Sequence, residues 1–247
     1  MSLEIAAGEQ IAIIGPSGAG KTTLLHTLAC AYQPEQGDYQ LFGQHPWAIS
    51  HHARHALRRA LFLAPQTPPL PPRQRVVTAV LAGSLPAWSL GRALRNLVKP
   101  VDPGSAWEAL GRFQLQHKLY SRVDRLSGGE RQRCGLARLI LSDAKLLLVD
   151  EPLSALDPTL ALQTLFSLQE EAAARKASLV CSLHQVELAR AHFPRIIGLR
   201  DGRIMFDTDK VSDEMIAALY HNGVVSDQAP AIELPDENCT IDDPRCF

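Results

Sequence analysis

The fold of this 247-residue chain is decided by the stretch Gly15-Pro16-Ser17-Gly18-Ala19-Gly20-Lys21-Thr22. It fits the pattern G-x-x-x-x-G-K-[ST], which is the pattern of a phosphate-binding loop. The apolar residues 10–14 before it predict a buried strand, and residues 23–30 after it predict a helix. Because the motif needs a strand on one side and a helix on the other, this context favours a real phosphate site over a glycine-rich turn.

Each residue type in the loop has a chemical reason to be there. The glycines let backbone N–H groups close around phosphate oxygens, and the N-terminus of the following helix adds partial positive charge. Lys21 supplies a mobile cation for the β- and γ-phosphates, and the Thr22 hydroxyl can ligate Mg²⁺. The loop therefore predicts a nucleotide with its magnesium ion.

Composition narrows the class of protein. The chain is 46% hydrophobic, and its 25 Lys and Arg nearly balance its 26 Asp and Glu. This balance speaks against nucleic acid as the main partner. No apolar run reaches the roughly 18 residues of a membrane span, and residues 1–4 do not open a signal peptide. The densest basic stretch, residues 51–59, holds three histidines and is interpreted as a solvated helix face rather than a metal site.

The five cysteines fit a reduced, cytoplasmic setting. Cys30, Cys134 and Cys181 lie in apolar or helical stretches and are expected to be small core residues. Cys239 and Cys246 lie in a polar, acidic tail that spans residues 221–247 and is expected to be disordered. The pair could form a disulfide, but nothing in the sequence requires one.

Strand and helix patterns alternate along the chain, which predicts an α/β fold with a mostly parallel sheet. Strands are expected over 60–64, 145–150 and 178–182, with a short extended piece at 41–42 and a hairpin turning at Asp201-Gly202. A helical pattern over about 76–142 interrupts the alternation and is interpreted as an inserted helical subdomain. Further helices are expected over 133–141, 159–175, 185–192 and 211–220.

Two acids follow the most apolar of these strands. Residues 145–150 end in Asp150, and Glu151 comes next. Ligands of a parallel sheet gather where its strands end, so Asp150 is expected to face the magnesium ion held by Thr22. Glu151 would then reach the water that attacks the γ-phosphate, which is the second group that nucleotide hydrolysis needs.

The run Leu126-Ser127-Gly128-Gly129-Glu130-Arg131-Gln132 precedes a predicted helix. Ser127 can cap that helix, and the two glycines allow a close backbone approach to an anion. Taken alone, the run could be an ordinary cap. Its position between a phosphate loop and the Asp150 strand makes a nucleotide contact the better interpretation.

With these motifs in order, residues 2–220 resemble the ATP-binding-cassette (ABC) family of ATPases. The resemblance implies a P-loop NTPase fold of the RecA type, with a mostly parallel core, the helical insert and an antiparallel edge. Residues 15–22 resemble the Walker A loop and residues 146–150 Walker B, while residues 154–157 resemble the D-loop. Gln66 resembles the glutamine of the Q-loop, and His184 resembles the switch histidine that senses the γ-phosphate.

The resemblance also implies a site and its partners. Two copies would dimerise head to tail around ATP, with a membrane permease as a separate chain and a periplasmic binding protein as an indirect partner. Such a subunit lies on the cytoplasmic face of the inner membrane. The implied catalytic residues are Glu151 and His184, and the implied magnesium ligands are Thr22, Gln66 and Asp150. The implied ATP contacts are Gly15, Pro16, Ser17, Gly18, Ala19, Gly20, Lys21, Thr22, Thr23, Gln66, Ser127, Gly128 and Gly129.

Three stretches resemble the phosphonate-importer branch of the family: residues 80–83 with 88–90 soon after, residues 184–190, and residues 196–204 with the closing residues 218–220. They imply uptake of a phosphonate or a related phosphorus oxyanion. An importer for another solute, such as an amino acid, stays open. The first strand of the family and its adenine-stacking aromatic residue are missing before Gly8, so a shortened cassette with impaired ATP binding stays open as well.

Three other classes are less consistent with the motifs. A soluble ABC protein of repair or translation would carry two cassettes or a coiled-coil insertion, and neither pattern appears. A P-loop kinase would need an arginine-rich lid, and a GTPase would need a guanine-reading motif. Neither of those two classes explains residues 126–130.

Overall fold

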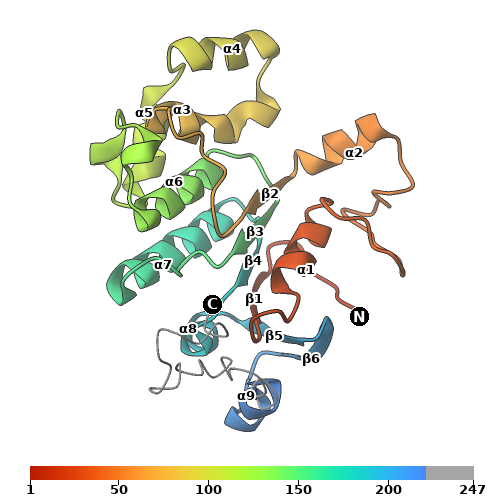
Figure 1. Cartoon of the computed structure of the whole chain (residues 1–247). Coiled ribbons are helices and arrows are strands. Elements are labelled where there is room, and N and C mark those ends of the chain that lie inside the picture. Colours follow the sequence, from red (N-terminus) through yellow and green to blue (C-terminus); the bar gives the residue numbers. More distant parts are fainter. Residues whose placement is uncertain (221–247) are drawn as a thin grey trace, which may run out of the picture.

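The computed structural model describes residues 1–220, so the tail at 221–247, with Cys239 and Cys246, lies outside the described residues. Within the described part, six strands form one sheet in the order β2-β3-β4-β1-β5-β6 (Figure 1). All neighbours pair in parallel except β5 and β6, which pair antiparallel. The strands are β1 (Gln10–Ile14), β2 (Leu61–Ala64), β3 (Leu146–Asp150), β4 (Ser178–Ser182), β5 (Arg195–Arg200) and β6 (Arg203–Thr208).

The described part has nine α-helices, of which the last follows the final strand. They are α1 (Lys21–Leu28), α2 (His51–Arg58), α3 (Val76–Leu81), α4 (Leu90–Val98), α5 (Pro103–Gly111), α6 (Gly128–Ile140), α7 (Pro158–Ala174), α8 (Val186–His192) and α9 (Asp213–Tyr220). Short 3₁₀ turns cover Ala82–Ala87, Gln116–Lys118 and Val123–Arg125. The helices from α3 to α6 lie between β2 and β3 in the chain, and α3 to α5 form a group beside one end of the sheet (Figure 1).

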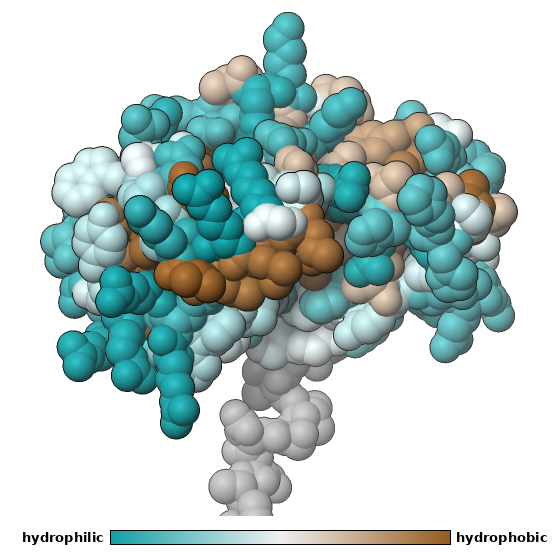
Figure 2. Space-filling model, turned by 90° about the horizontal axis from the view of Figure 1, so that it is seen from above, coloured by the Kyte–Doolittle hydropathy of each residue, from teal (hydrophilic) through white to brown (hydrophobic). Residues whose placement is uncertain are grey.

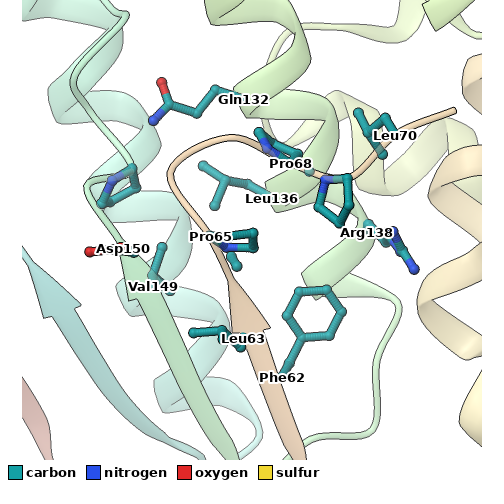
Figure 3. A pocket seen from close by; sticks show the side chains of 14 residues that line it. Phe62, Leu63, Pro65, Pro68, Leu70, Gln132, Leu136, Arg138, Val149 and Asp150 are labelled. Carbon is teal, nitrogen blue, oxygen red and sulfur yellow. The ribbon is translucent and has the colours of Figure 1, made fainter. Parts of the chain in front are cut away.

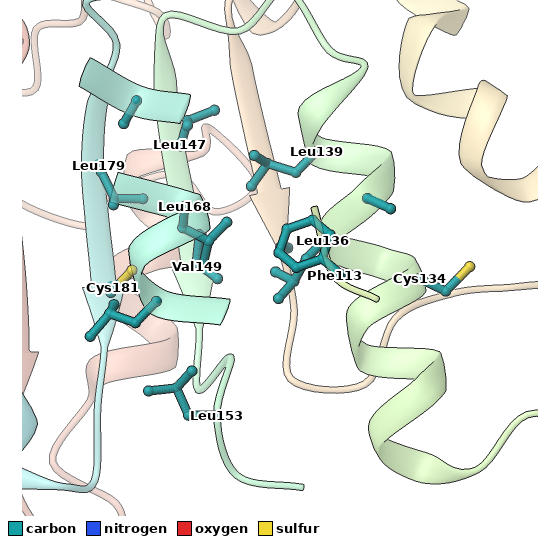
Figure 4. Packing of buried hydrophobic residues seen from close by; sticks show 14 of the residues in the cluster. Phe113, Cys134, Leu136, Leu139, Leu147, Val149, Leu153, Leu168, Leu179 and Cys181 are labelled. Atoms are coloured by element: carbon teal, nitrogen blue, oxygen red, sulfur yellow. The ribbon is translucent and has the colours of Figure 1, made fainter. Parts of the chain in front are cut away.

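The sheet is buried on both faces because alternate residues of each strand point in opposite directions. One face packs against α6 and α7 through side chains such as Leu147, Leu179 and Leu168 (Figure 4). The other face packs against α1, with Ile13, Leu148 and Leu25 fully buried. The apolar runs predicted as strands therefore form the middle layer of a three-layer α/β fold.

The predicted fold class is confirmed, including the mostly parallel sheet and the antiparallel edge formed by the β5–β6 hairpin. Residues 1–9 form no strand. The extended piece expected at residues 41–42 is only an isolated bridge between Leu41 and Gln44. Within residues 1–220, no helix combines the length and the hydropathy needed to cross a membrane.

Among the predicted helix boundaries, the start of α6 differs most from the structure. The helix expected over 133–141 begins at Gly128 and ends at Ile140. Ser127 and Glu130 form a capping box, in which each side chain accepts a hydrogen bond from the backbone N–H of the other. This reciprocal cap satisfies N–H groups at the helix start and extends the helix over both glycines despite their poor helix propensity.

The close packing of the 3₁₀ turn Ala82–Ala87 against α6 depends on Gly83. A Cβ atom on Gly83 would lie 2.0 Å from the carbonyl oxygen of Arg138, whereas a Cβ on Gly91 would meet nothing within 4 Å. We expect Gly83→Ala to lower the free energy of unfolding by about 2 kcal/mol or more, because helix backbone must move. Gly91→Ala, inside α4, should raise it by up to about 1 kcal/mol. Urea unfolding measures both, and equal effects would contradict this packing.

Candidate active site

The phosphate-binding loop connects β1 to α1 at the centre of the sheet. Its first glycine is required by space, because a Cβ on Gly15 would lie 2.0 Å from the carbonyl oxygen of Leu199 in β5. Gly20 has φ +99° and precedes the first residue of α1, a conformation that favours glycine. The strand, loop and helix predicted from the sequence are therefore the observed ones, although α1 begins at Lys21 rather than at Thr23.

Lys21 lies folded over this loop. Its Nζ donates hydrogen bonds to the carbonyl oxygens of Gly15 at 2.8 Å and Pro16 at 3.1 Å, and the residue is only 5% exposed. Burial lowers the pKa of Lys21, while the negative charges of Glu151 and Asp150 act to raise it. These two carboxylates therefore favour the charged form of Lys21, which lies beside the loop that is predicted to bind phosphate.

Asp150 joins three elements at the end of β3. Thr22 Oγ1 donates a hydrogen bond to Asp150 Oδ2 at 2.8 Å, and Ser182 Oγ donates to Asp150 Oδ1 at 2.6 Å. The carboxylate is therefore bound from α1 on one side and from β4 on the other, and Asp150 is 4% exposed. The predicted pairing of Thr22 with Asp150 is present as a direct contact.

The donor set at this point fits a hard divalent cation. Hydroxyl and carboxylate oxygens such as those of Thr22 and Asp150 are the ligands that Mg²⁺ takes in nucleotide sites, with phosphates and water completing the octahedron. Within residues 1–220, no three His, Cys, Asp or Glu side chains gather into a site of their own. The protein would therefore supply only a few oxygen ligands, and the phosphates and water would supply the others.

Glu151 lies at a strained turn immediately after β3. It has φ +48°, which is costly for a residue other than glycine and persists only where neighbours hold it. Its N–H donates to Ser182 Oγ at 2.9 Å, and its carbonyl oxygen accepts from Gln132 Nε2 at 2.6 Å. After this turn the two consecutive carboxylates have different partners, with Thr22 and Ser182 at Asp150 and with Gln66 and His184 at Glu151.

The carboxylate of Glu151 has two polar neighbours from separate segments. Gln66 Nε2 donates to Glu151 Oε2 at 2.7 Å, and His184 Nε2 lies 2.5 Å from Glu151 Oε1. The side chain of Glu151 is 12% exposed, whereas that of His184 is 47% exposed. The fold thus brings together three of the predicted site residues that are far apart in the sequence.

Ser127 and the two glycines after it form a second cluster. Ser127 caps α6, and Glu130 of the same cap lies 3.1 Å from Lys118 Nζ. Burial acts to raise the pKa of Glu130, but the Ser127 N–H and Lys118 together hold it below its usual value. A Cβ on Gly129 would lie 2.7 Å from the carbonyl oxygen of Ala155, so the helix start packs against residues 154–157.

The two clusters are separate within one chain. None of the hydrogen bonds among residues 1–220 joins residues 127–129 to the phosphate-binding loop. A groove of about 600 Å³ lies beside the second cluster, with Gln66, Gly128, Gln132 and Ser154 in its lining and no residue of the phosphate-binding loop. One chain therefore carries both of the clusters that were predicted to contact phosphate but does not place them around the same point.

The loop that carries Gln66 runs across α6. Residues 65–72 contain five prolines, and a Cβ on Gly135 of α6 would lie 2.6 Å from Pro68 Cγ. Beneath the loop is a largely apolar cavity of about 150 Å³, with Phe62 and Leu136 in its lining (Figure 3). The prolines restrict the backbone of the loop and therefore keep its path across α6 stiff.

Sequence reasoning missed two residues that hold the site. Ser182 is the last residue of β4 and was included only as part of a strand, and Gln132 was included only in the run before the helix. Ser182 is fully buried and Gln132 is 4% exposed. A polar residue at the end of an otherwise apolar strand was the available signal for Ser182.

Comparison with known proteins agrees with this geometry. The family model described as ABC transporter matches residues 1–154. The chain belongs to the ABC transporter family. The resemblance drawn from its motifs is confirmed, and the chain is an ABC ATPase subunit.

Curated relatives are close over most of the chain. A protein of Albidiferax ferrireducens, named phosphonates import ATP-binding protein PhnC 2, is 60% identical over 89% of this chain and 80% of its own length. A phosphonates import ATP-binding protein PhnC of Pseudomonas fluorescens is 52% identical over 94% of this chain and 88% of its own.

Solved structures share the fold. A putative metal-chelate type ABC transporter in an inward-facing conformation is 26% identical, with a TM-score of 0.72 over 90% of this chain and 82% of its own. A dimeric ATP-binding cassette in a post-hydrolysis state, bound to ADP and phosphate, is 24% identical. Its TM-score is 0.73 over 85% of this chain and 89% of its own.

The hydroxyl of Ser182 should matter for activity beyond its effect on stability. Ser182→Ala leaves Asp150 Oδ1 and the Glu151 N–H without their partner, so we expect a loss of about 1–3 kcal/mol in unfolding free energy. ATP hydrolysis should fall on the order of tenfold to a hundredfold, because both acids lose their alignment. Steady-state ATPase assays and urea unfolding measure the two effects.

Ser178→Ala is the matched control for this prediction. Ser178 lies at the other end of β4, where its hydroxyl donates to the Ala6 carbonyl and accepts from the Gly8 N–H. It should cost similar stability and leave hydrolysis nearly unchanged. Equal ATPase rates in the two variants would contradict a positioning role for Ser182.

Proposed function

We propose that this chain is the ATP-hydrolysing subunit of an ABC importer that takes up a phosphonate or a related phosphorus oxyanion. The observation that carries the proposal is the 60% identity, over 89% of the chain, to a relative named as a phosphonate import ATP-binding protein. The solute would pass through a separate permease, so its identity is argued from the relatives and not from a pocket in this chain.

ATP and Mg²⁺ would be held by residues that the fold already gathers. The loop from Gly15 to Thr22, with Thr23 behind it, would bind the phosphates through backbone N–H groups, and Lys21 would leave its two carbonyl partners for the β- and γ-phosphates. Thr22, Asp150 and Gln66 would face the magnesium ion. Bound there, Mg²⁺ neutralises charge on the β- and γ-phosphates.

Glu151 would direct the hydrolytic water. Its carboxylate accepts a hydrogen bond from the water, whose oxygen forms a bond to the γ-phosphorus while the bond from that phosphorus to the β–γ bridging oxygen breaks. The proton of the water passes to Glu151. Gln66 and His184, which contact the carboxylate at 2.7 Å and 2.5 Å, would orient it and detect the γ-phosphate.

A second copy of the chain would complete each site. Because residues 127–129 lie apart from the loop of their own chain, the cap of α6 in a facing copy would supply the remaining contacts to the γ-phosphate. ATP would then favour the closed dimer, and hydrolysis would reverse the shift. The Gln66 loop and the helical region over about 76–142 would transmit this motion to the permease.

The remaining features of the proposal follow from that assembly. The subunit would lie on the cytoplasmic face of the inner membrane, with a periplasmic binding protein as an indirect partner and no nucleic acid. Residues 1–220 would form the ATPase domain, with residues 221–247 as a polar tail.

Glu151→Gln tests the chemical part of the proposal. The amide keeps the size of the side chain but cannot take the proton, so we expect turnover to fall roughly 100-fold or more while ATP still binds. The variant should also accumulate as an ATP-bound dimer in gel filtration. Glu170→Gln on the exposed surface of α7 is the control and should behave like the wild type. Wild-type turnover in Glu151→Gln would remove Glu151 from this role.

A growth experiment tests which solute the importer takes up. In a bacterial strain that lacks its own phosphonate-import ATPase, this chain with its neighbouring permease genes should restore growth on a phosphonate as sole phosphorus source. A Lys21→Ala variant should not restore it, and growth on inorganic phosphate should be equal in all strains. Active ATPase without phosphonate growth, but with restored uptake of an amino acid, would contradict the phosphonate branch and keep the ATPase role.

A further inference from the structure

Helix α4 is oriented with its apolar side chains away from the protein. It contacts the rest of the fold mainly through Asn96, which is 2% exposed, and the half-buried Ala93. We name its outward-facing apolar side chains the α4 stripe: Leu90 (76% exposed), Leu94 (56%), Leu97 (66%) and Val98 (92%). A surface helix of a globular protein normally buries such residues, so the stripe is the feature that needs an explanation.

This orientation is fixed by specific contacts and not by a frayed helix. Ser89 caps the N-terminus by accepting a hydrogen bond from the Arg92 N–H, and Arg92 lies over the Trp88 ring, 4.9 Å from its centroid. At the other end, Asn96 Oδ1 accepts from the Val101 N–H at 3.2 Å. The buried amide anchors the polar side of α4 to the protein and leaves the stripe facing outward.

The stripe lies in the most basic part of the chain. Residues 39–101 contain eight of the 25 Lys and Arg and none of the 26 Asp and Glu. Three of these cations, Arg92, Arg95 and Lys99, lie on α4 or directly after it, and others lie on α2. Figure 1 places α2 and α4 toward the same end of the molecule, and from that end Figure 2 shows an apolar stripe bordered by hydrophilic side chains.

We propose that the α4 stripe and the cations around it bind the surface of an anionic lipid bilayer directly. An amphipathic helix with exposed leucines and flanking Lys or Arg inserts its apolar side into the headgroup boundary and attracts acidic headgroups. Nucleic acid would use the cations but not four exposed aliphatic side chains. The surface acts without nucleotide, because none of its residues belongs to the ATP site, although α4 lies within the helical region over about 76–142 that the proposed function couples to the permease.

Vesicle flotation with the full chain tests the proposal. The probes are vesicles of phosphatidylcholine mixed with phosphatidylglycerol, and vesicles of phosphatidylcholine alone. The wild-type chain should float with the anionic vesicles and much less with the neutral ones. Leu94→Gln with Leu97→Gln should lower partitioning at least about tenfold, because two apolar side chains lose their insertion. Arg95→Gln should lower it about fivefold and weaken its dependence on salt.

The matched control is Phe166→Gln with Met205→Gln, which removes two exposed apolar residues (45% and 50% exposed) from α7 and β6. It should float like the wild type. Thermal melts confirm that the variants are folded, and ATPase rates in detergent-free buffer should be unchanged in all of them. Equal flotation of the α4 variant and the wild type would overturn the proposal. So would wild-type retention on duplex DNA without flotation, or equal binding to neutral vesicles.

Discussion

The hydrogen bonds that Asp150 accepts from Thr22 and Ser182 are the contacts on which the rest of the site depends. They tie the helix after the phosphate loop to the ends of β3 and β4, which are not adjacent to it in sequence. A buried carboxylate is costly unless its oxygens are hydrogen-bonded, so this arrangement holds only while both partners stay in register. The parallel pairing of β3 with β4 and of β4 with β1 supplies that register.

From this fixed point, the position of Glu151 follows. Glu151 comes directly after Asp150, and its left-handed backbone turns the chain sharply at this point. The side-chain amide of Gln132 in α6 donates a hydrogen bond to the carbonyl oxygen of Glu151, so α6 contacts the same turn. The helix that presents Ser127 at its start thus contacts the Glu151 turn through one side chain. This contact gives a physical route between the α6 cap and the acid of the same chain.

Much of this could be predicted from the sequence, because local patterns determined it. The phosphate loop, the apolar strands and the acid pair each follow from residue type and spacing. The start of α6 was missed because glycine propensity argued against a helix that the Ser127–Glu130 cap in fact stabilises. The orientation of α4 could not be predicted from the sequence. Periodicity reveals an apolar face, but it does not show that the side carrying Asn96 is the one that packs against the protein. The contacts of Ser182 and Gln132 depend on tertiary structure.

In the proposed dimer, one chain holds half of each ATP site and a second copy holds the other half. A crystal structure of the Glu151→Gln variant grown with ATP and Mg²⁺ tests this arrangement most directly. We expect a head-to-tail dimer with Ser127 of each copy within hydrogen-bond distance of the γ-phosphate bound to the other. A nucleotide bound by Lys21 and Thr22 with no facing Ser127, in a monomer or in any other dimer, would contradict it.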